Sequence, residues 1–371
     1  MKIAILGTRG IPNKYGGFEQ FAENLSTQLV QRGHRVIVYS PHFHDSNEPL
    51  YKGVEIIKIN SPEKFLHGAA NFVYDNRCID NVMNQDIDIA LVCGYASSVF
   101  SSKKMSKSKK PIFVVNVDGL EWARPKWSFI TKKMIRWAEK RIAKSNIHLV
   151  TDHQIIKEYY HNTYKVDSSY ISYGADVPIN FDESALLKYN LNPQKYMLAI
   201  SRIEPDNNIE LIINGFLLSK TDNPLVIVGN CNTKFGKILT KKYASFNSIK
   251  FIGSVFEKPI LDNLRYYSNI YFHGHSVGGT NPSLLEAMAC GTYIVSHDNI
   301  YNRAIIESNG AFFKSPSNIS QIINNPKAIE DQRSSFGELN IQKIKNEFSW
   351  KKIVDEYENL FFRLSNTQKA V

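Results

Sequence analysis

Residues 275 to 291, with the sequence HSVGGTNPSLLEAMACG, combine residue types that can bind a phosphate group. Gly278 and Gly279 allow the backbone to approach a ligand closely, and Asn281 and Pro282 suit the N-cap and first position of a helix. The start of such a helix presents free backbone N–H groups and a partial positive charge. We therefore expect an anion to bind around these residues, which include Thr280 and Ser283.

Glu286 is the only acid of this predicted helix and lies one turn beyond its start. It would be within reach of a hydroxyl-bearing group attached to the bound phosphate. Leu284, Leu285 and Met288 would form the buried side, and Gly291 would end the helix as a left-handed cap. The alternative is an ordinary loop and helix with a solvated Glu286, which the glycine pair by itself would favour.

A second glycine-containing loop, GTRGIPNKYGGFE, occupies residues 7 to 19 between a predicted strand and a predicted helix. Its glycines do not have the GxGxxG spacing of a dinucleotide site. Gly16 and Gly17 nevertheless permit close backbone approach at the start of the helix, and Arg9 and Lys14 add positive charge there. This loop is the second place where we expect a ligand.

Two further polar residues follow predicted strands. Asp118 precedes Gly119 after the strand that ends near 117, where it is either a turn-forming residue or a functional carboxylate. Arg202 follows the strand 196–201 and could donate to a diphosphate oxygen at the same edge as residues 278–283.

Two groups have residue types found in metal sites. Asp86 and Asp88 form a DxD pair, but they directly precede the apolar stretch IALVC and are better explained as a polar turn entering a strand. His42, His44 and Asp45 have no partner motif and are better explained as loop residues. We predict no metal site and no cofactor.

Apolar runs alternate with amphipathic segments along the whole chain, which predicts an α/β fold with doubly wound sheets. In such sheets, ligands bind beyond the carboxyl ends of the strands. The expected strands are 2–6, 35–40, 54–59, 89–93, 112–117, 148–152, 196–201, 225–229, 249–252, 269–273 and 292–296. The main expected helices are 18–32, 126–147, 208–219, 283–290 and 351–364.

With 371 residues, the chain is too long for one typical domain and suits two domains of about 150 to 200 residues each. Four isolated cysteines indicate neither disulfides nor zinc, and no stretch approaches the ~20 apolar residues of a membrane span. A reducing cytoplasm is the expected compartment. The net charge of +10 favours anionic partners but does not choose among nucleic acid, lipid and phosphorylated substrates.

Residues 126–147 form a predicted helix that carries both aromatic and basic side chains. Trp127, Ile130, Met134 and Trp137 share one face, and lysines and arginines occupy the rest. Together with the loop KKMSKSKK at 103–110, they give a basic surface with interfacial aromatics. Contact with an anionic membrane is one hypothesis, and a solvated helix explains the pattern equally well.

The segments SRIEPDNN at 201–208, NPSLLEAMACG at 281–291 and FSW at 348–350 resemble glycosyltransferase family 4, whose members are retaining enzymes of the GT-B fold. The resemblance spans nearly the whole chain. It implies two facing Rossmann-like domains, 1–178 for the acceptor and 179–348 for a nucleotide sugar, with 349–371 returning to the first. It also implies catalysis without a metal.

The loop GTRGIPNKYGGFE and the segment VNVDGLEW at 115–122 resemble a narrower subset among bacterial polysaccharide enzymes, which includes rhamnosyltransferases. That resemblance implies transfer to a lipid-diphosphate-linked acceptor at the cytoplasmic face of the membrane, with a lean towards dTDP-rhamnose as donor.

The roles that follow from the resemblance fall into three groups. Diphosphate and donor binding is assigned to Arg202, Gly278, Gly279, Thr280, Asn281, Pro282 and Ser283, and ribose binding to Glu286. The acceptor side is assigned to Arg9, Tyr15, Gly16, Gly17, Phe18, Glu19 and Asp118. The residues expected to act in catalysis are Arg202, Asp118 and Glu286.

The chain departs from the family pattern at three positions. Gly278 stands where the wider family often has the first Glu of an ExxxxxxxE motif, so donor-sugar contacts cannot be carried over. Asn207 replaces a common Lys, which leaves Arg202 and the helix start to handle more of the diphosphate charge. Asp118 stands where many relatives have His.

Two other classes remain open on the residues alone. One is an epimerase or phosphorylase of GT-B architecture, and the other is a non-catalytic binder of nucleotides or nucleic acid. We expect no nucleic-acid partner, because the glycine loops and Arg202 favour small phosphorylated ligands over a basic stripe.

Overall fold

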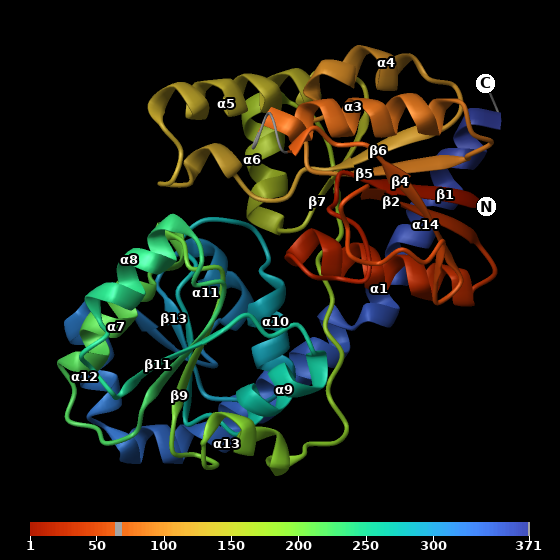
Figure 1. The fold of residues 1–371 in the computed structure, drawn as a ribbon. Coiled ribbons are helices and arrows are strands. Elements are labelled where there is room, and N and C mark those ends of the chain that lie inside the picture. Colours follow the sequence, from red (N-terminus) through yellow and green to blue (C-terminus); the bar gives the residue numbers. More distant parts are fainter. Residues whose placement is uncertain (64–68, 370–371) are drawn as a thin grey trace. The chain divides into compact units, whose positions relative to one another are not determined.

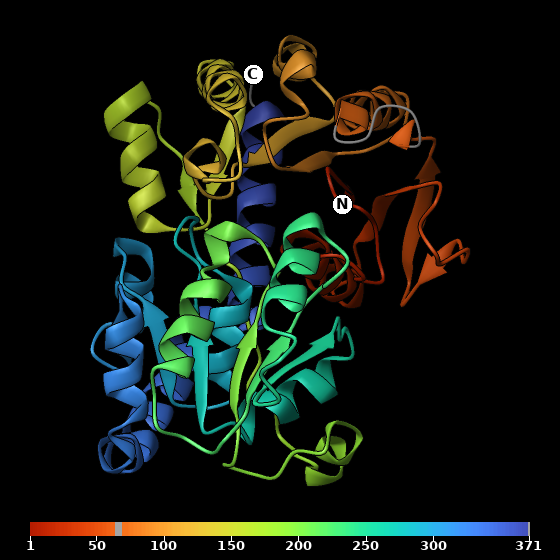
Figure 2. The ribbon, with the colours of Figure 1, turned by 60° about the vertical axis from the view of Figure 1, so that its left-hand side comes forward.

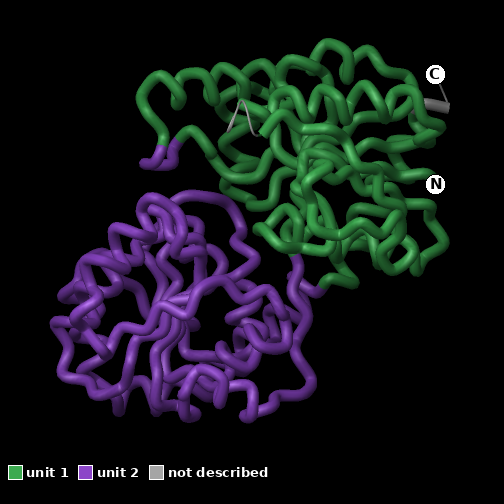
Figure 3. The backbone as a smooth tube through the Cα atoms, in the orientation of Figure 1, with its two compact units in different colours: residues 1–122, 127–173, 350–371 green, residues 123–126, 174–349 purple. Residues whose placement is uncertain are grey.

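The computed structural model describes residues 1–63 and 69–369, and it confirms the α/β fold with two largely parallel sheets (Figure 1). The chain divides into two compact units (Figure 3). Unit 1 comprises residues 1–122, 127–173 and 350–371, and unit 2 comprises 123–126 and 174–349. None of the helices within the described residues is long and apolar enough to cross a bilayer.

Within the described residues of unit 1, the sheet has eight strands in the order β3-β4-β2-β1-β5-β6-β7-β8, and only the β3–β4 pair is antiparallel. The strands are β1 Lys2–Leu6, β2 Arg35–Pro41, β3 Leu50–Tyr51, β4 Val54–Ile59, β5 Ile89–Cys93, β6 Ile112–Asn116, β7 His148–Thr151 and β8 Ser169–Tyr170. The central strands are apolar and buried on both sides because helices cover both faces. The short edge strands β3 and β8 were not predicted.

Helices α1 and α14 pack on one face of this sheet, and α3, α4 and α5 lie on the other (Figure 1). The helices of unit 1 are α1 Gly17–Gln31, α3 Ala70–Met83, α4 Ser102–Lys107, α5 Phe129–Ala143, α6 Gln154–Tyr164 and α14 Trp350–Lys369, with short 3₁₀ turns η2 Val99–Ser101 and η3 Glu121–Ala123. Figure 2 shows α14 running beside the sheet.

Helix α1 forms as its sequence predicts. Phe21, Leu25 and Leu29 are spaced for one face and are fully buried. Gly33 ends the helix with φ of +85°, a conformation that glycine adopts without strain.

Helix α14 completes the core beneath α1 although it lies over 300 residues away in the sequence. The Phe21 ring lies 6.3 Å from Trp350 and 5.3 Å from Tyr357, centroid to centroid. At the far end, the Arg32 guanidinium and the His34 ring contact the Glu358 carboxylate at 2.8 and 2.6 Å. The last helix is therefore an integral part of unit 1.

The unit 2 sheet has six parallel strands in the order β11-β10-β9-β12-β13-β14. The strands are β9 Met197–Ile200, β10 Leu225–Val228, β11 Ile249–Gly253, β12 Ile270–His273, β13 Ile294–His297 and β14 Ala311–Phe313. The helices are α7 Ile209–Leu217, α8 Lys234–Lys242, α9 Lys258–Tyr266, α10 Pro282–Ala289, α11 Ile300–Ile306, α12 Pro316–Ile323 and α13 Pro326–Lys343, with 3₁₀ turns η4 Glu183–Tyr189 and η5 Pro205–Asn207 and a π-helical turn η6 Ile344–Phe348. Strand β14 was not predicted.

One hydrophobic core joins this sheet to α7 and α12. Ile212 and Phe216 of α7 and Ile319 of α12 pack with Ile227 and Phe272 of the sheet. Gly215 lets α12 approach α7, because a Cβ atom at Gly215 would lie 2.5 Å from Ile319. On the other face, α10 packs against α9 and α13.

The fit of α14 can be tested with two adjacent phenylalanines. Phe361 is fully buried, whereas 45% of Phe362 is exposed. We expect Phe361→Ala to lower the free energy of unfolding of unit 1 by about 3 to 5 kcal/mol, because it leaves a cavity in the core beside Tyr357. Phe362→Ala is the control and should cost less than about 1 kcal/mol. Equal effects of the two substitutions in urea unfolding would contradict this packing.

Candidate active site

The predicted donor residues meet at the carboxyl edge of the unit 2 sheet, where β9 and β12 end side by side. The two strands are parallel neighbours, with Phe272 level with Ala199. The loop after β9 carries Arg202, and the loop after β12 carries residues 278–283. The sheet register therefore brings together residues that are about 80 positions apart in the chain.

Three hydrogen bonds join these two loops. The backbone N–H and Oγ of Ser276 both donate to the carbonyl of Asp206, at 3.0 and 2.9 Å, and the Asn208 side-chain amide donates to the carbonyl of Gly274 at 2.7 Å. The approach needs a glycine, because a Cβ atom at Gly274 would lie 2.0 Å from the Asn207 carbonyl oxygen. The loops consequently form one structural unit.

Helix α10 begins where the sequence predicts. Asn281 is the N-cap, since its side chain accepts the Ser283 N–H at 3.0 Å, and Pro282 is the first helical residue. The Ser283 hydroxyl contacts the Tyr271 hydroxyl at 2.6 Å and donates to the Ile200 carbonyl at 3.3 Å. These bonds fix the positive end of α10 directly over the ends of β9 and β12.

The residues before α10 differ in exposure. Thr280 is buried, whereas Gly278 and Gly279 are partly exposed. Gly278 has φ of +141°, and a Cβ atom there would meet open space. This position favours glycine because of its backbone conformation and leaves room beside the loop.

Arg202 is exposed, and its guanidinium has no ion-pair partner within the residues that the structure describes. Its backbone is well held, because the buried Asn207 donates a side-chain N–H to the Arg202 carbonyl at 2.7 Å. The buried Asn207 thus stabilises the backbone of the loop. The lysine that the family commonly has at this position would add a positive charge there. The Arg202 charge remains available to an anion.

From the sequence, Glu286 was expected either to bind a ligand or to be solvated. In the structure it is buried and ion-paired. It is 7% exposed, and one of its oxygens accepts a hydrogen bond from the guanidinium of Arg265, which is 1% exposed, at 2.5 Å. Burial by itself lowers the pKa of Arg265, but the negative groups around it, with Glu286 the largest contributor, together outweigh burial and raise that pKa. The ion pair therefore connects α9 to α10 and orients the Glu286 carboxylate.

Two histidines at the end of β12 also belong to this site, and the sequence reasoning missed them. His273 is fully buried with no partner for either ring nitrogen among the described residues, and it stacks on His275 with the ring centroids 4.5 Å apart. Burial and the charges of Arg124 and Arg202 lower the pKa of His275 to about 3. His275 is thus a neutral hydrogen-bonding group beside Arg202, and its position after a strand was the only available signal.

Arg124, in the short segment that belongs to unit 2, contributes a second buried charge. Its guanidinium donates to Asp206 at 2.8 Å, and Asp206 is 1% exposed. Asp206 lies in the loop that carries Arg202, and its backbone carbonyl accepts the Ser276 N–H, so the ion pair ties Arg124 to this loop. The sequence offered no sign of it, because the two residues are 82 positions apart.

The predicted acceptor residues lie in unit 1: most belong to the loop after β1 and the first turn of α1, and Asp118 follows β6. The Arg9 N–H donates to the buried Glu19 carboxylate at 2.7 Å, which holds the loop against the first turn of α1. The Arg9 guanidinium contacts Glu63 at 3.3 Å and lies 4.8 Å from the centre of the Tyr15 ring. Arg9 is therefore already ion-paired, in contrast to Arg202.

The other members of this group lie at the start of α1. Gly16 is the N-cap, and no side chain caps the helix. Gly17 and Tyr15 are exposed, and Phe18 is partly buried, with its ring in contact range of a Cβ atom built at Gly94. Gly17 is exposed and Gly16 is partly exposed, and neither residue places a side chain over this helix start.

Asp118 lies at the carboxyl end of β6 in the left-handed region, with φ of +56°. The Asn116 side chain accepts its N–H at 3.0 Å, and the Tyr173 hydroxyl donates to its carboxylate at 3.2 Å. Asp118 therefore forms the Asp-Gly turn and also presents its carboxylate at the sheet edge. The turn-forming role and a functional role, given as alternatives from the sequence, are compatible.

Asp75 of α3 is a further carboxylate at this edge that the sequence did not reveal. It is 3% exposed, and its charge, like those of Glu19 and Asp118, acts on the buried Cys93 thiol at the end of β5. Burial raises the pKa of Asp75 to about 6, against the smaller opposing effects of Ser97 and Arg9. The sequence of α3 does not indicate that Asp75 is buried beside Tyr74 and Cys78.

The two groups considered for metal binding have other partners. Asp86 pairs with Lys2 and with Lys110, and Asp88 pairs with Lys110 at 3.1 Å. His44 contacts the Pro12 carbonyl, and His42 accepts the Ser61 N–H. These contacts suit the turn and loop assignments.

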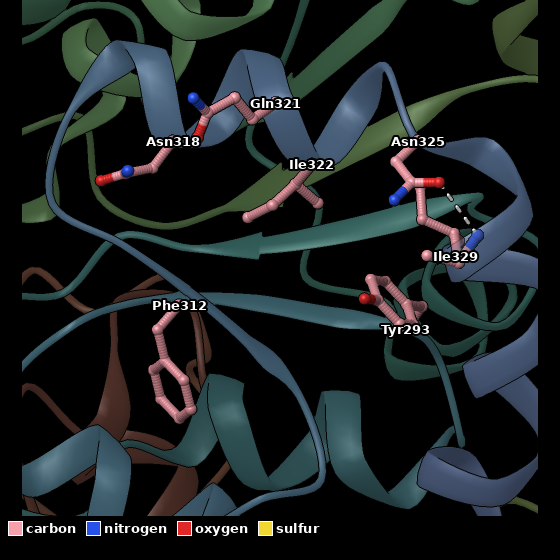
Figure 4. A pocket seen from close by; sticks show the side chains of 8 residues that line it. Tyr293, Phe312, Asn318, Gln321, Ile322, Asn325 and Ile329 are labelled. Carbon is pink, nitrogen blue, oxygen red and sulfur yellow. Dashed lines mark hydrogen bonds between the residues drawn. The ribbon is translucent and has the colours of Figure 1, made fainter.

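A pocket of about 260 Å³ lies elsewhere in unit 2, between β14 and the helices α12 and α13 (Figure 4). It is lined by Tyr293, Phe312, Asn318, Gln321, Ile322, Asn325, Ala328 and Ile329. Tyr293 precedes β13, so the pocket reaches the amino edge of the sheet, opposite the ends of β9 and β12. It contains none of the predicted site residues.

Comparison with known protein families divides the chain close to the boundary between unit 1 and unit 2, near residue 174. Residues 187–343 match the family described as Glycosyl transferases group 1, and residues 1–176 match a domain of unknown function, DUF1972. An uncharacterized glycosyltransferase of Methanocaldococcus jannaschii, MJ1069, is 40% identical over 128 residues, and the match spans about a third (32%) of each protein.

Solved structures of similar fold cover nearly the whole chain. Sucrose-phosphate synthase of Thermosynechococcus elongatus has a TM-score of 0.82 at 14% identity, covering 99% of both chains. Anabaena HepE, solved with UDP and glucose, has 0.77 at 15%, covering 98% of this chain and 100% of its own. WaaG, from lipopolysaccharide biosynthesis, has 0.73 at 14%, covering 96% and 99%. The fold is therefore that of GT-B glycosyltransferases.

The buried ion pair in unit 2 leads to a stability prediction. We expect Glu286→Ala to lower the free energy of unfolding of unit 2 by about 3 kcal/mol, because it leaves the Arg265 charge buried without its main partner. The double variant Arg265→Met, Glu286→Leu should recover much of the loss. A single variant as stable as the wild type in urea unfolding would show that the pair is not needed.

The raised pKa of Asp75 leads to a pH prediction. Between pH about 4 and 6 the folded protein keeps a proton on Asp75 that the unfolded chain has lost, so stability falls as the pH rises through this range. Asp75→Asn removes the buried charge and should raise the free energy of unfolding at pH 7 by up to about 3 kcal/mol, with little change at pH 4. The same pH dependence in both proteins would refute it.

Proposed function

We propose that this chain, in which residues 187–343 match the glycosyl transferases group 1 family, is a retaining glycosyltransferase that uses a nucleoside-diphosphate sugar. One observation carries the proposal. The exposed Arg202, which has no ion-pair partner among the described residues, and the capped start of α10 lie at adjoining strand ends, joined by hydrogen bonds. Together they make a positive site suited to a diphosphate.

The chemical demand in such a transfer is to stabilise the departing diphosphate. The bond between the sugar's anomeric carbon and the diphosphate oxygen breaks, and a bond to the acceptor hydroxyl oxygen forms. In our proposal, Arg202 and the positive end of α10 beside Gly279 bind the negative charge that develops on the leaving group. The departing phosphate oxygen accepts the proton of the acceptor hydroxyl, so no covalent nucleophile is required.

Glu286 and His275 have proposed roles beside the diphosphate. The Arg265 contact orients the Glu286 carboxylate, as binding of ribose hydroxyls would require. His275 is neutral and lies near Arg202, so it is suited to bind a donor hydroxyl or phosphate oxygen without repelling the substrate. In this role, His275 would replace part of the donor contact that a glutamate makes in relatives at the position of Gly278.

The acceptor is assigned to unit 1. Gly16 and Gly17 offer an open helix start, while Asp118 presents a carboxylate at the sheet edge that can orient a hydroxyl group. Arg9, Tyr15, Phe18 and Glu19 shape the loop between them. Transfer also requires that water be kept from the donor, since water would otherwise hydrolyse it.

The finer identity of the substrates is also a proposal. The resemblance of residues 7–19 and 115–122 to rhamnosyltransferases of bacterial polysaccharide synthesis supports dTDP-rhamnose as donor and a lipid-diphosphate-linked glycan as acceptor. The acceptor places the reaction in surface polysaccharide synthesis at the cytoplasmic face of the membrane. The open space beside Gly278 is where a donor different from that of the wider family would be accommodated.

The proposal is tested by nucleotide release from a panel of nucleotide sugars, with and without lipid-linked acceptors. We expect release from dTDP-rhamnose only when an acceptor is present. Release from no donor would count against transfer. A changed sugar nucleotide formed without acceptor would favour an epimerase, and sugar phosphate formed with added phosphate would favour a phosphorylase.

Arg202 gives the sharpest test of the site. We expect Arg202→Ala to lower turnover by about 100-fold or more, because it removes a preorganised charge from the leaving group. Lys327→Ala is the matched control, since Lys327 is an exposed cation of α13 and should have no effect. Circular dichroism would establish that both variants are folded. Wild-type turnover in Arg202→Ala would refute the assignment.

A further inference from the structure

The large apolar side chains of α5 point away from the core of unit 1. Phe129, Ile130, Met134 and Trp137 are 71%, 72%, 56% and 48% exposed. The buried face of the helix is formed by Ile135, Ala138, Glu139, Ile142 and Ala143. An amphipathic helix that only covered a core would place its largest apolar residues inward, so the outward face needs another explanation.

Two neighbouring elements extend this face. Phe100 of η2 is 58% exposed, and its ring lies 6.1 Å from Trp137. The partly buried Phe72 of α3 lies 5.6 Å from Phe100. We define the apolar strip as Phe72, Phe100, Phe129, Ile130, Met134 and Trp137. It draws on three elements that lie on the same side of the sheet (Figure 1), so it is a surface and not a set of scattered residues.

Basic side chains surround the apolar strip. The Lys133 ammonium lies 4.5 Å from the centre of the Phe129 ring, and the Arg141 guanidinium lies 5.6 Å from that of Trp137. The other exposed cations on α4 and α5 are Lys103, Lys104, Lys107, Arg136, Lys140 and Lys144. The single acid of α5, Glu139, is fully buried. The solvent-facing side of α5 therefore carries positive charge only.

The apolar strip is held rigidly from beneath. The Glu139 carboxylate accepts hydrogen bonds from the hydroxyls of Tyr159 and Tyr164 at 2.7 and 2.6 Å, and from Tyr95 and Trp122 at 3.2 and 3.0 Å. Ser128 caps the start of the helix by accepting the Thr131 N–H at 3.2 Å. Since the inner face of α5 is fixed in this way, the outward orientation of Phe129 to Trp137 belongs to the folded state.

We infer that the apolar strip and its basic rim dock on an anionic lipid bilayer, with α5 lying in the plane of the interface. Apolar side chains enter the boundary between headgroups and acyl chains, and the lysines and arginines contact lipid phosphates. Charge complementarity selects this occupant, because a second copy would bring an equally positive rim against the first. The inference deepens the proposed function. The docking surface stands on its own observations, and only its link to a membrane-borne acceptor rests on the proposed function.

Vesicle co-sedimentation of the full chain tests the inference. We expect binding to phosphatidylcholine vesicles that contain phosphatidylglycerol, much weaker binding to phosphatidylcholine alone, and loss of binding as the salt concentration rises. The double variant Ile130→Ser, Trp137→Ser and the charge variant Lys133→Glu, Lys140→Glu should each bind at least about tenfold more weakly. The control Ile238→Ser, Leu339→Ser changes two exposed apolar residues of unit 2 and should bind as the wild type does.

The outcomes separate this inference from the proposed function. Donor turnover with a water-soluble acceptor should be the same in the wild type and both strip variants, and its absence in the wild type would count against the proposed function alone. Equal vesicle binding by wild type and strip variants, or no preference for phosphatidylglycerol, would overturn the docking surface. So would self-association that the double variant abolishes without any binding to vesicles.

Discussion

The parallel pairing of β9 with β12 is the constraint on which the candidate donor site depends. It places two loops from distant parts of the chain at one sheet edge, and Gly274 allows them to touch because no side chain separates them from the Asn207 carbonyl. Ser283 then connects the start of α10 to the end of β9. The loop that carries Arg202 and the start of α10, each a weak anion site alone, thereby lie at the same sheet edge.

Buried carboxylates hold the helices in place around the two candidate regions. Glu286 joins α10 to α9 through Arg265, and Glu139 joins α5 to Tyr159 and Tyr164 of α6. A buried charge is costly unless its partners are complete, so each group is compatible with only one arrangement of its neighbours. The same interactions that position Glu286 in unit 2 thus make it part of the fold as well as of the proposed site.

The two faces of α5 show how a helix can serve packing and binding at once. Small and medium side chains such as Ala138 and Ile142 meet the core, while Trp137 and Ile130 remain outside. The helix gives up burial of its largest apolar groups, and the hydrogen bonds to Glu139 offset part of that loss. The proposed membrane contact and the proposed transfer in unit 2 therefore depend on different residues of the chain.

The sequence by itself determined the features that depend on near neighbours. Apolar runs predicted all of the longer strands, Asn281 and Pro282 predicted the start of α10, and Gly33 predicted the end of α1, because propensity and capping act over a few residues. The site residues at strand ends, such as Arg202 and Asp118, followed from the same topology. Only the tertiary structure decided that Glu286 pairs with Arg265, that His275 lies beside Arg202, that Asp75 is buried near Cys93, and which side of α5 faces out. These depend on contacts between residues far apart in the chain, and the pattern of a single sequence contains no information on which distant side chains will meet.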